Sequence, residues 1–200
     1  MKLVAATSNK HKLGEFRRIL QPLGIEVISA LEAVGHSLEI EETGSTFMEN
    51  SAQKAEAIYK ATGLPTFADD SGLCIDAMGG APGIYSARYG GENTPHSEKI
   101  KLILKELDGV ADEKRTARFV AAIYCVLNDE HAISCEGSVE GKIGYEPKGK
   151  DGFGYDPIFM VGERSFAEHS DAEKDAISHR GIALREFCAK LEKALQDKKT

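Results

Sequence analysis

The order of apolar segments along the chain constrains its fold more than any other feature of the sequence. Over the first third of the chain, short apolar runs typical of buried strands alternate with amphipathic patterns typical of helices. Further on, runs rich in Val, Ile and Tyr flank a turn at Asn128 and predict antiparallel strands. The predicted strands are Lys2–Ala6, Ile25–Ile28, Thr66–Ala68, Phe119–Leu127, His131–Cys135, Ser138–Ile143 and Ile158–Val161. We therefore expect an α/β fold with a mixed β-sheet and helices packed on it, not a regular parallel barrel.

Four helices have clear sequence signatures. One begins at Asn93-Thr94-Pro95, with proline at the first helical position, and carries Ile100, Ile103, Leu104 and Leu107 on one face. Leu13–Leu20 and Leu184–Leu195 both carry apolar residues at helical spacing. Thr46 and Glu49 have the spacing of a capping box ahead of an Ala-rich segment, which Gly63 should end. The predicted helices therefore lie on either side of the predicted hairpin strands as well as between the first strands.

The length and composition are those of a globular protein. The chain has 200 residues, 42% hydrophobic and 28% charged, and these values exclude a disordered or fibrous protein. The length suits one domain, or two closely joined lobes, and the chain has no repeat, low-complexity tract or linker. We expect residues 1–200 to form a single domain of two lobes.

The charge balance bears on the kinds of partner. Lys and Arg number 25 against 32 Asp and Glu, which gives a net charge of −7 and argues against a nucleic-acid-binding module. A local group of lysines still permits a small anionic ligand. No apolar run approaches the ~18 residues that span a bilayer, and the apolar run near the N-terminus is too short for a signal peptide. We expect a cytoplasmic protein with no membrane partner.

Four cysteines lie far apart in the sequence, at Cys74, Cys125, Cys135 and Cys188. They form no C-x-x-C pair, so the sequence gives no indication of a zinc site. In a reducing compartment we expect four free thiols in packed positions.

A polar turn between the first strand and the first helix is a candidate phosphate site. A helix N-terminus offers unsatisfied N–H groups and a positive dipole end, and nearby lysines add full charges. The candidate residues are Thr7, Ser8, Asn9, Lys10, His11 and Lys12. Asn9 can bind phosphate oxygens or cap the helix. A capped helix with solvated lysines explains the same residues equally well.

Two acidic segments form a second candidate site. Asp69-Asp70-Ser71-Gly72 ends a predicted buried strand, and Glu41-Glu42 precedes a predicted helix. Like charges at the end of an apolar strand are costly unless they are paired or bind a cation. Carboxylate oxygens suit Mg²⁺, which takes one or two of them together with substrate phosphates. Asp70 is also a candidate general base towards water. Turn and helix-cap roles remain the alternative.

Two further polar segments are candidates for ligand contact. In Gly149–Pro157, aromatic residues alternate with glycines and end in Asp156, an arrangement that can stack on and hydrogen-bond a nucleobase. A tight turn with its aromatic rings in the core is the alternative. Lys174 and Ser178–Gly181 bring basic residues to a helix N-terminus, against the helix dipole. They bind an anion or a carbonyl oxygen, or are simply solvated. The Gly-rich segment Gly79–Gly91 is interpreted as architectural, with its arginine in a structural or interface ion pair.

Taken together, these segments resemble the inosine triphosphate pyrophosphatase family over essentially the whole chain. The blocks that carry the resemblance are Thr7-x-Asn9-x-x-Lys12, EETGSTFMEN from Glu41, FADDSGL from Phe67, GGAPGIYSARYGG from Gly79, GFGYDPIF from Gly152 and AISHRG from Ala176. Six ordered blocks are far more specific than any single one. Many members have glycine where this chain has Ser8, so the tightness of the first loop can differ.

The resemblance implies a fold and a reaction. The fold is an elongated mixed sheet with two lobes around a central cleft, usually in a homodimer. The reaction is Mg²⁺-dependent hydrolysis of ITP, dITP and XTP between the α- and β-phosphates, which cleanses the nucleotide pool. Asp70 is the implied catalytic base, and Glu41 and Asp70 are the implied metal ligands; Asp69 and Glu42 are close enough in sequence to share that role. The implied substrate contacts are Thr7, Ser8, Asn9, Lys10, His11, Lys12, Ser71, Phe153, Gly154, Tyr155, Asp156, Lys174, His179 and Arg180.

Selectivity is expected at the purine 6-position. Donors from His179, Arg180 or the backbone would pair with the 6-oxygen of inosine or xanthine and be left facing an amino group in ATP. Two other hypotheses are a related pyrophosphatase for modified pyrimidine nucleotides and a sensor that binds nucleotides without turnover. The blocks GFGYDPIF and SHRG argue against the first, and the presence of both Glu41 and Asp70 argues against the second.

Overall fold

The computed structural model describes residues 1–36, 38 and 40–197. Its strands form one seven-stranded sheet in the order β2-β1-β3-β4-β5-β6-β7. Their bounds are β1 (Lys2–Ala5), β2 (Glu26–Ser29), β3 (Thr66–Ile75), β4 (Thr116–Asn128), β5 (His131–Ile143), β6 (Phe159–Val161) and β7 (Arg164–Ser165). β1 runs parallel to β2 and β3, whereas β6 runs antiparallel to β5 and β7. The expected mixed sheet is therefore confirmed.

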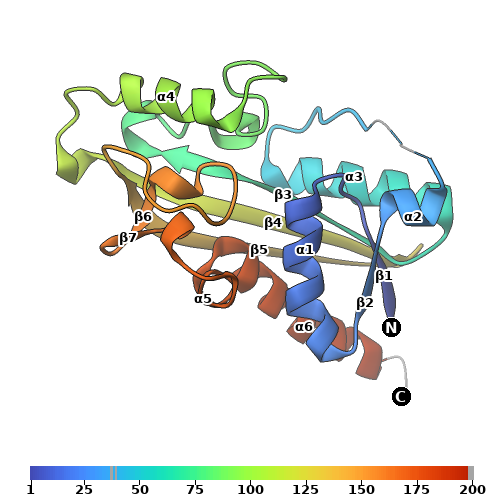
Figure 1. Cartoon of the computed structure of the whole chain (residues 1–200). Helices are drawn as coiled ribbons and strands as arrows, with labels where there is room; N and C mark the ends of the chain where they lie inside the picture. Colours follow the sequence, from blue (N-terminus) through green and yellow to red (C-terminus); the bar gives the residue numbers. More distant parts are fainter. Residues whose placement is uncertain (37, 39, 198–200) are drawn as a thin grey trace. The chain divides into compact units, whose positions relative to one another are not determined.

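Six α-helices accompany the sheet in the described part of the chain (Figure 1). They are α1 (Lys10–Leu20), α2 (Ala30–Val34), α3 (Phe47–Thr62), α4 (His96–Glu106), α5 (Asp171–Ile177) and α6 (His179–Asp197). Thr46 caps α3 through the Glu49 N–H, and Gly63 ends it in the left-handed conformation, as the sequence predicts. Within the described residues, no helix is both long and apolar enough to cross a membrane.

The chain divides into two compact units. Unit 1 comprises Met1–Asp70, Ala121–Gly137 and Arg180–Thr200, and unit 2 comprises Ser71–Val120 and Ser138–His179. The last three residues of the predicted domain 1–200 lie outside the described residues. The chain passes from one unit to the other within β3, β4 and β5, so the division separates neighbouring residues such as Asp70 and Ser71.

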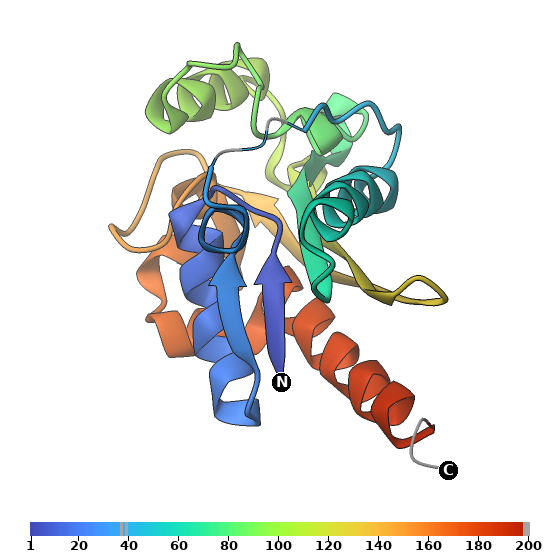
Figure 2. The same ribbon diagram turned by 90° about the vertical axis from the view of Figure 1, so that its right-hand side faces the viewer.

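Unit 1 buries its first strands on both faces. Leu3 and Ala5 of β1 and Phe67 of β3 belong to the same apolar cluster as Phe16 of α1 and Phe187 of α6. The Phe67 ring lies 5.0 Å from that of Phe16 and 5.9 Å from that of Phe187, between ring centroids. Figure 2 shows β1 and β2 side by side next to α1. One face of these strands is thus covered by α1 and α6.

The alternate residues of the same strands face a different helix. Val4 and Ala6 of the first strand region and Ala68 of β3 cluster with Ala55 and Ile58 of α3. Successive side chains of a strand point to opposite faces of the sheet, so this alternation follows directly from the extended backbone. It also fixes the face taken by every later residue of β3.

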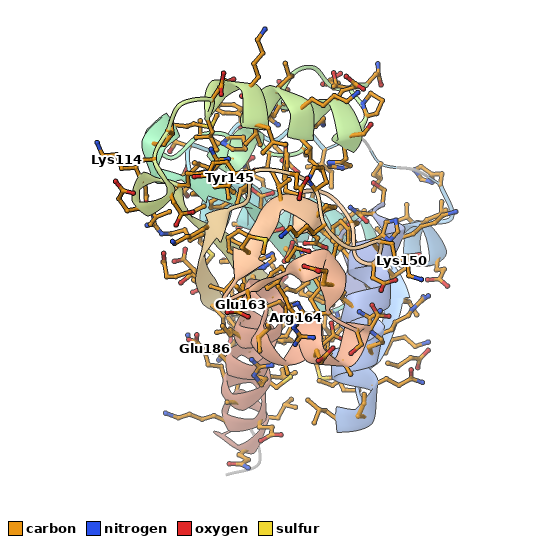
Figure 3. The ribbon with its side chains drawn as sticks, turned by 60° about the vertical axis from the view of Figure 1, so that its left-hand side comes forward. Lys114, Tyr145, Lys150, Glu163, Arg164 and Glu186 are labelled. Carbon is orange, nitrogen blue, oxygen red and sulfur yellow. The ribbon has the colours of Figure 1, made fainter. Side chains whose placement is uncertain are left out.

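Unit 2 has its own aromatic core. The Phe119 ring of β4 lies 4.7 Å from the Phe159 ring and 5.9 Å from the Phe166 ring, between centroids. Ile100 and Ile103 of α4 belong to the same cluster. At the surface, Arg164 of β7, labelled in Figure 3, pairs with Glu173 of α5 at 3.1 Å, which ties the short β6–β7 hairpin to that helix.

The predicted strand lengths were wrong in two places. The strand predicted over Thr66–Ala68 continues to Ile75, so the acidic segment Asp69–Gly72 lies inside β3 and not in a turn. The two strands predicted over 131–143 form one continuous strand, β5. In addition, α5 was not predicted, and α6 begins at His179, so His179 and Arg180 belong to its first turn. All four cysteines are free, and three of them are buried.

Candidate active site

The two adjacent aspartates of β3 face opposite sides of the sheet. Asp69 lies on the side of Phe67, towards α1 and α6, and Asp70 lies on the side of Ala68, towards α3. Both side chains are nearly buried, with 1% and 7% of their residues' surfaces exposed. Buried carboxylates require compensating charge, and each finds it on its own side.

Asp69 is compensated by two cations from distant segments. Arg180 of α6 donates from Nε to Oδ2 at 3.1 Å and from Nη2 to Oδ1 at 3.2 Å, and Lys12 of α1 donates to Oδ1 at 2.6 Å. Arg180 also donates from Nη1 to the carboxylate of Glu15. Burial alone would raise the pKa of Asp69, but Arg180 and Lys12 hold it well below its usual value. Asp69 is therefore an ionised anchor, and it does not share a side of the sheet with Asp70.

Asp70 is held from the opposite side by α3. Lys54 donates to Oδ1 at 3.1 Å, and Asn50 donates from Nδ2 to Oδ2 at 3.3 Å. Lys54 also pairs with Glu42 at 2.9 Å and donates to the backbone carbonyl of Asp69 at 3.1 Å. Burial raises the pKa of Asp70 against the opposing charges of Lys54 and Lys12. A carboxylate with a raised pKa is better suited to accept a proton than one held strongly ionised.

The acidic segment before α3 places one of its carboxylates beside Asp70. Glu42 shares the Lys54 ammonium with Asp70, and Asp70 and Glu42 together raise the pKa of Lys54 although burial acts in the opposite direction. Glu41 is exposed to solvent. In the described part of the chain, no three His, Cys, Asp or Glu side chains converge as a metal-binding group.

The turn after β1 adopts a capped-helix geometry. Asn9 is the N-cap of α1, and its Oδ1 accepts hydrogen bonds from the His11 and Lys12 N–H groups at 2.9 and 3.2 Å. Thr7 Oγ1 accepts the Asn9 N–H at 3.1 Å. The capping alternative is thus realised, and Ser8, Asn9, Lys10 and His11 are exposed at the helix N-terminus. Phosphate binding by these residues stays a prediction.

The Gly-rich segment of unit 2 is built around Asp156. The Asp156 carboxylate accepts the Phe153 N–H at 2.7 Å and pairs with Lys174 at 2.7 Å, with both side chains only 4% exposed. Gly152 has φ +70°, and a Cβ there would lie 2.2 Å from Asp156 Oδ2. Only glycine allows this backbone to wrap the carboxylate so closely.

The aromatic residues of the same segment have different surroundings. Tyr155 is buried in the unit 2 core, and its hydroxyl donates to the Ser86 carbonyl at 2.8 Å. Phe153 is half-buried, and the Lys174 ammonium lies 4.6 Å from its ring centroid. The core alternative therefore holds for the Tyr155 ring, and Phe153 is the ring of this segment with partial exposure. Gly154 lies between the two.

The last two candidates, His179 and Arg180, are neighbours at the start of α6 but have different contacts. The buried His179 ring stacks on Phe119 in unit 2, with centroids 4.7 Å apart and an interplanar angle of 11°. Arg180 belongs to unit 1, is 2% exposed and donates to Asp69 and Glu15. Arg180 thus takes part in a buried ion-pair network, and substrate contact by His179 and Arg180 stays a prediction. Ser71 follows Asp70 in β3 and is half-buried.

Three site residues were not singled out from the sequence. Lys54 and Asn50 lie one turn apart on α3, and Glu15 lies on α1 one turn after Lys12. Their i, i+3 and i, i+4 spacing places each pair on one helix face. That spacing was the available signal, together with the place of Asn50 at the end of the block EETGSTFMEN. A helix with scattered polar residues has no other local feature that marks it as part of a site.

The fold and these buried charge clusters define a mixed α/β protein with a polar site built into one central strand. The chain belongs to the Ham1 family, whose sequence profile matches residues 3–190. This confirms the family relationship indicated by the six sequence blocks.

Curated relatives and solved structures agree with this membership. The dITP/XTP pyrophosphatase of Bacillus licheniformis is 48% identical over 194 residues, which cover 96% of this chain and 98% of the relative. That of Bacillus subtilis is 48% identical over 191 residues, covering 94% and 96%. The solved HAM1 protein of Coxiella burnetii aligns with a TM-score of 0.86 at 44% identity, covering 96% of this chain and 99% of that one. The Ham1 protein of Staphylococcus aureus aligns with a TM-score of 0.86 at 39% identity, covering 97% and 100%.

Proposed function

We propose that this chain is a Mg²⁺-dependent pyrophosphatase that hydrolyses ITP, dITP and XTP to the nucleoside monophosphate and pyrophosphate. The observation that carries the proposal is the Asp70 carboxylate, buried in β3 and held on both oxygens by Asn50 and Lys54. The names of the closely similar relatives support the substrate class. Hydrolysis in the cytoplasm by a homodimer is part of the proposal.

The acidic residues suit the proposed metal. Glu41 and Asp70 offer hard oxygen ligands, and Mg²⁺ takes one or two carboxylates alongside substrate phosphates. The Lys54 ammonium already lies between the carboxylates of Glu42 and Asp70, so this part of the site is built to hold positive charge. When bound, Mg²⁺ would neutralise charge on the phosphates.

The reaction uses one water molecule. The water oxygen bonds to the α-phosphorus, the bond from that phosphorus to the bridging oxygen breaks, and pyrophosphate leaves. We assign Asp70 to orient the water and accept its proton, in keeping with its raised pKa. We assign the exposed N-terminus of α1, with Lys10, to bind the triphosphate, and Lys12 to reach it from its pair with Asp69.

Base recognition is assigned to residues of unit 2. Phe153 offers a partly exposed ring for stacking, and Asp156 and Lys174 hold its segment in place. Of the two donors considered for the purine 6-oxygen, we choose His179 because Arg180 donates to Asp69 and Glu15. A buried donor left facing the amino group of ATP costs about 1–3 kcal/mol.

The test is hydrolysis of ITP, XTP, GTP and ATP with Mg²⁺, with identification of the phosphate product. Pyrophosphate from ITP and XTP, with little product from ATP, is the expected result. Orthophosphate as the first product would place the attack at the γ-phosphorus and overturn the assignment of Asp70. Binding of ITP without turnover would favour a nucleotide sensor instead. Preference for modified pyrimidine nucleotides in a wider panel would overturn the substrate class.

A further inference from the structure

Asn50 is a fully buried amide with a contact at each end. Its residue surface is 0% exposed. Its Nδ2 donates to Asp70 Oδ2 at 3.3 Å, and its Oδ1 accepts the Gly44 N–H at 2.8 Å. A buried amide is costly unless both of its ends are hydrogen-bonded. Here the two partners are the proposed catalytic carboxylate and the backbone of the acidic segment before α3.

The position of Asn50 on α3 complements that of Lys54. The two residues are four apart, so their side chains leave the same helix face one turn from each other. Lys54 donates to Oδ1 of Asp70 and Asn50 donates to Oδ2. A carboxylate held through both oxygens by one rigid helix has a fixed rotation about its Cβ–Cγ bond.

The Gly44 backbone approaches Asn50 more closely than any other residue type would allow. A Cβ on Gly44 would lie 2.7 Å from Asn50 Oδ1 and 2.7 Å from the Glu49 Cβ. The neighbouring residues are bound to α3 as well. Ser45 donates from its N–H and its hydroxyl to Glu49 Oε2 at 2.7 and 2.8 Å.

A second amide binds the same segment without touching Asp70. Gln53 accepts the Thr43 N–H at 3.1 Å and donates to Thr43 Oγ1 at 3.0 Å. Thr43 and Gly44 are the two residues after Glu42, so the two amides fix the segment that carries Glu41 and Glu42. Gln53 therefore provides a matched control, since it shares the loop contact of Asn50 but not the carboxylate contact.

We propose that Asn50 is a positioning residue that sets the orientation of the Asp70 carboxylate and couples it to the Glu41–Gly44 segment. The inference rests on the proposed function of Asp70. Asn50 acts on the carboxylate and not on the nucleotide. Its loss should therefore slow turnover more than it weakens substrate binding.

The experiment compares Asn50→Asp, Asn50→Leu and Gln53→Leu with the unmodified chain. An aspartate at position 50 keeps the shape and the acceptor for the Gly44 N–H but offers Asp70 no N–H donor. The readouts are kcat and KM for dITP with saturating Mg²⁺, and hydrogen exchange of the Thr43 and Gly44 amides by NMR. The exchange measurement needs neither metal nor substrate.

We expect both Asn50 variants to lose about 10- to 100-fold in kcat, with KM changed by less than about threefold. Gly44 exchange should accelerate in Asn50→Leu and stay slow in Asn50→Asp, because only the latter keeps the acceptor. Gln53→Leu should accelerate Thr43 exchange and retain kcat within about threefold.

Three results would overturn the proposal. The first is an unchanged kcat in the Asn50 variants. The second is a kcat that correlates with slow exchange of the Gly44 amide, so that Asn50→Asp keeps the kcat of the unmodified chain and Asn50→Leu loses it. The third is an equal loss in Gln53→Leu. If Asn50→Leu does not fold, the near-isosteric Asn50→Asp still decides the role of the donor. Absence of turnover in the unmodified chain would instead refute the proposed function, which separates the two failures.

Discussion

Arg180 donates two parallel hydrogen bonds to Asp69, from Nε to Oδ2 at 3.1 Å and from Nη2 to Oδ1 at 3.2 Å. The two residues are 111 positions apart in the sequence and are both almost fully buried. The planar guanidinium fits the planar carboxylate, an arrangement that lysine does not reproduce. The pair fixes the first turn of α6 against β3. It also allows a charged residue to stand in the middle of a buried strand.

Replacing Asp69 by asparagine should destabilise the fold strongly. The Asp69→Asn variant leaves Lys12 without its carboxylate partner and Arg180 with Glu15 alone. Breaking a buried pair in this way costs about 3–5 kcal/mol. Urea unfolding measures the loss, with Glu98→Gln as the control because Glu98 pairs with Lys101 at an exposed surface. A loss below about 1 kcal/mol would show that the network contributes little stability.

Replacing Asp70 should separate activity from stability. We expect Asp70→Asn to lower turnover of dITP by about 10²- to 10⁴-fold. The free energy of unfolding should not fall by more than about 1 kcal/mol, because the raised pKa shows that the fold does not favour the ionised carboxylate. Steady-state kinetics and urea unfolding on the same preparation test both parts. Near-normal turnover would remove Asp70 from the catalytic role.

Ser86 should be important for the stability of unit 2. Its hydroxyl accepts the buried N–H of Leu73 in β3 at 2.9 Å and donates to the Gly83 carbonyl at 2.7 Å. Ser86→Ala leaves the Leu73 N–H without this acceptor, which costs about 1–3 kcal/mol. Ser138→Ala, at an exposed position of β5, is the control for thermal unfolding. Equal melting temperatures for the two variants would contradict the expectation.

The cap of α5 should give a pH-dependent stability. Hydrogen bonds from the backbone and side chain of Ser170 lower the pKa of Glu173 from 4.5 to about 2. The ionised carboxylate therefore stabilises the fold above its unfolded-state pKa, and this contribution is lost as the pH falls. The melting temperature of Glu173→Gln should lie below that of the unmodified chain at neutral pH. This difference in melting temperature should shrink as the pH falls from 4.5 to about 2. A difference that does not change over this range would refute the prediction.

Much of the architecture follows from local sequence features. The strand and capped helix at the N-terminus, the bounds of α3 and the β4–β5 hairpin were all predicted from apolar periodicity and capping residues. These features depend on residues within a few positions of one another, where propensity and hydrogen bonding act directly. The six motif blocks likewise identified the family, because each block is a contiguous stretch of sequence.

The length of β3 could not be predicted in this way. Asp69-Asp70-Ser71-Gly72 has the composition of a turn, and local rules end the strand before it. The strand continues because Lys12, 57 residues from Asp69, and Arg180, 111 residues away, supply the missing charge. Such long-range compensation has no local signature.

The sequence by itself determined the class of fold, the family and the segments that carry the polar residues. Only the tertiary structure decided which side of the sheet each of those residues faces and which partners it contacts. Because β3 is extended, it turns Asp69 towards Arg180 and Asp70 towards Asn50 and Lys54, on opposite sides of the sheet. The sequence therefore shows two neighbouring acids of the same kind. The fold makes one an ionised structural anchor and gives the other the raised pKa of a candidate base.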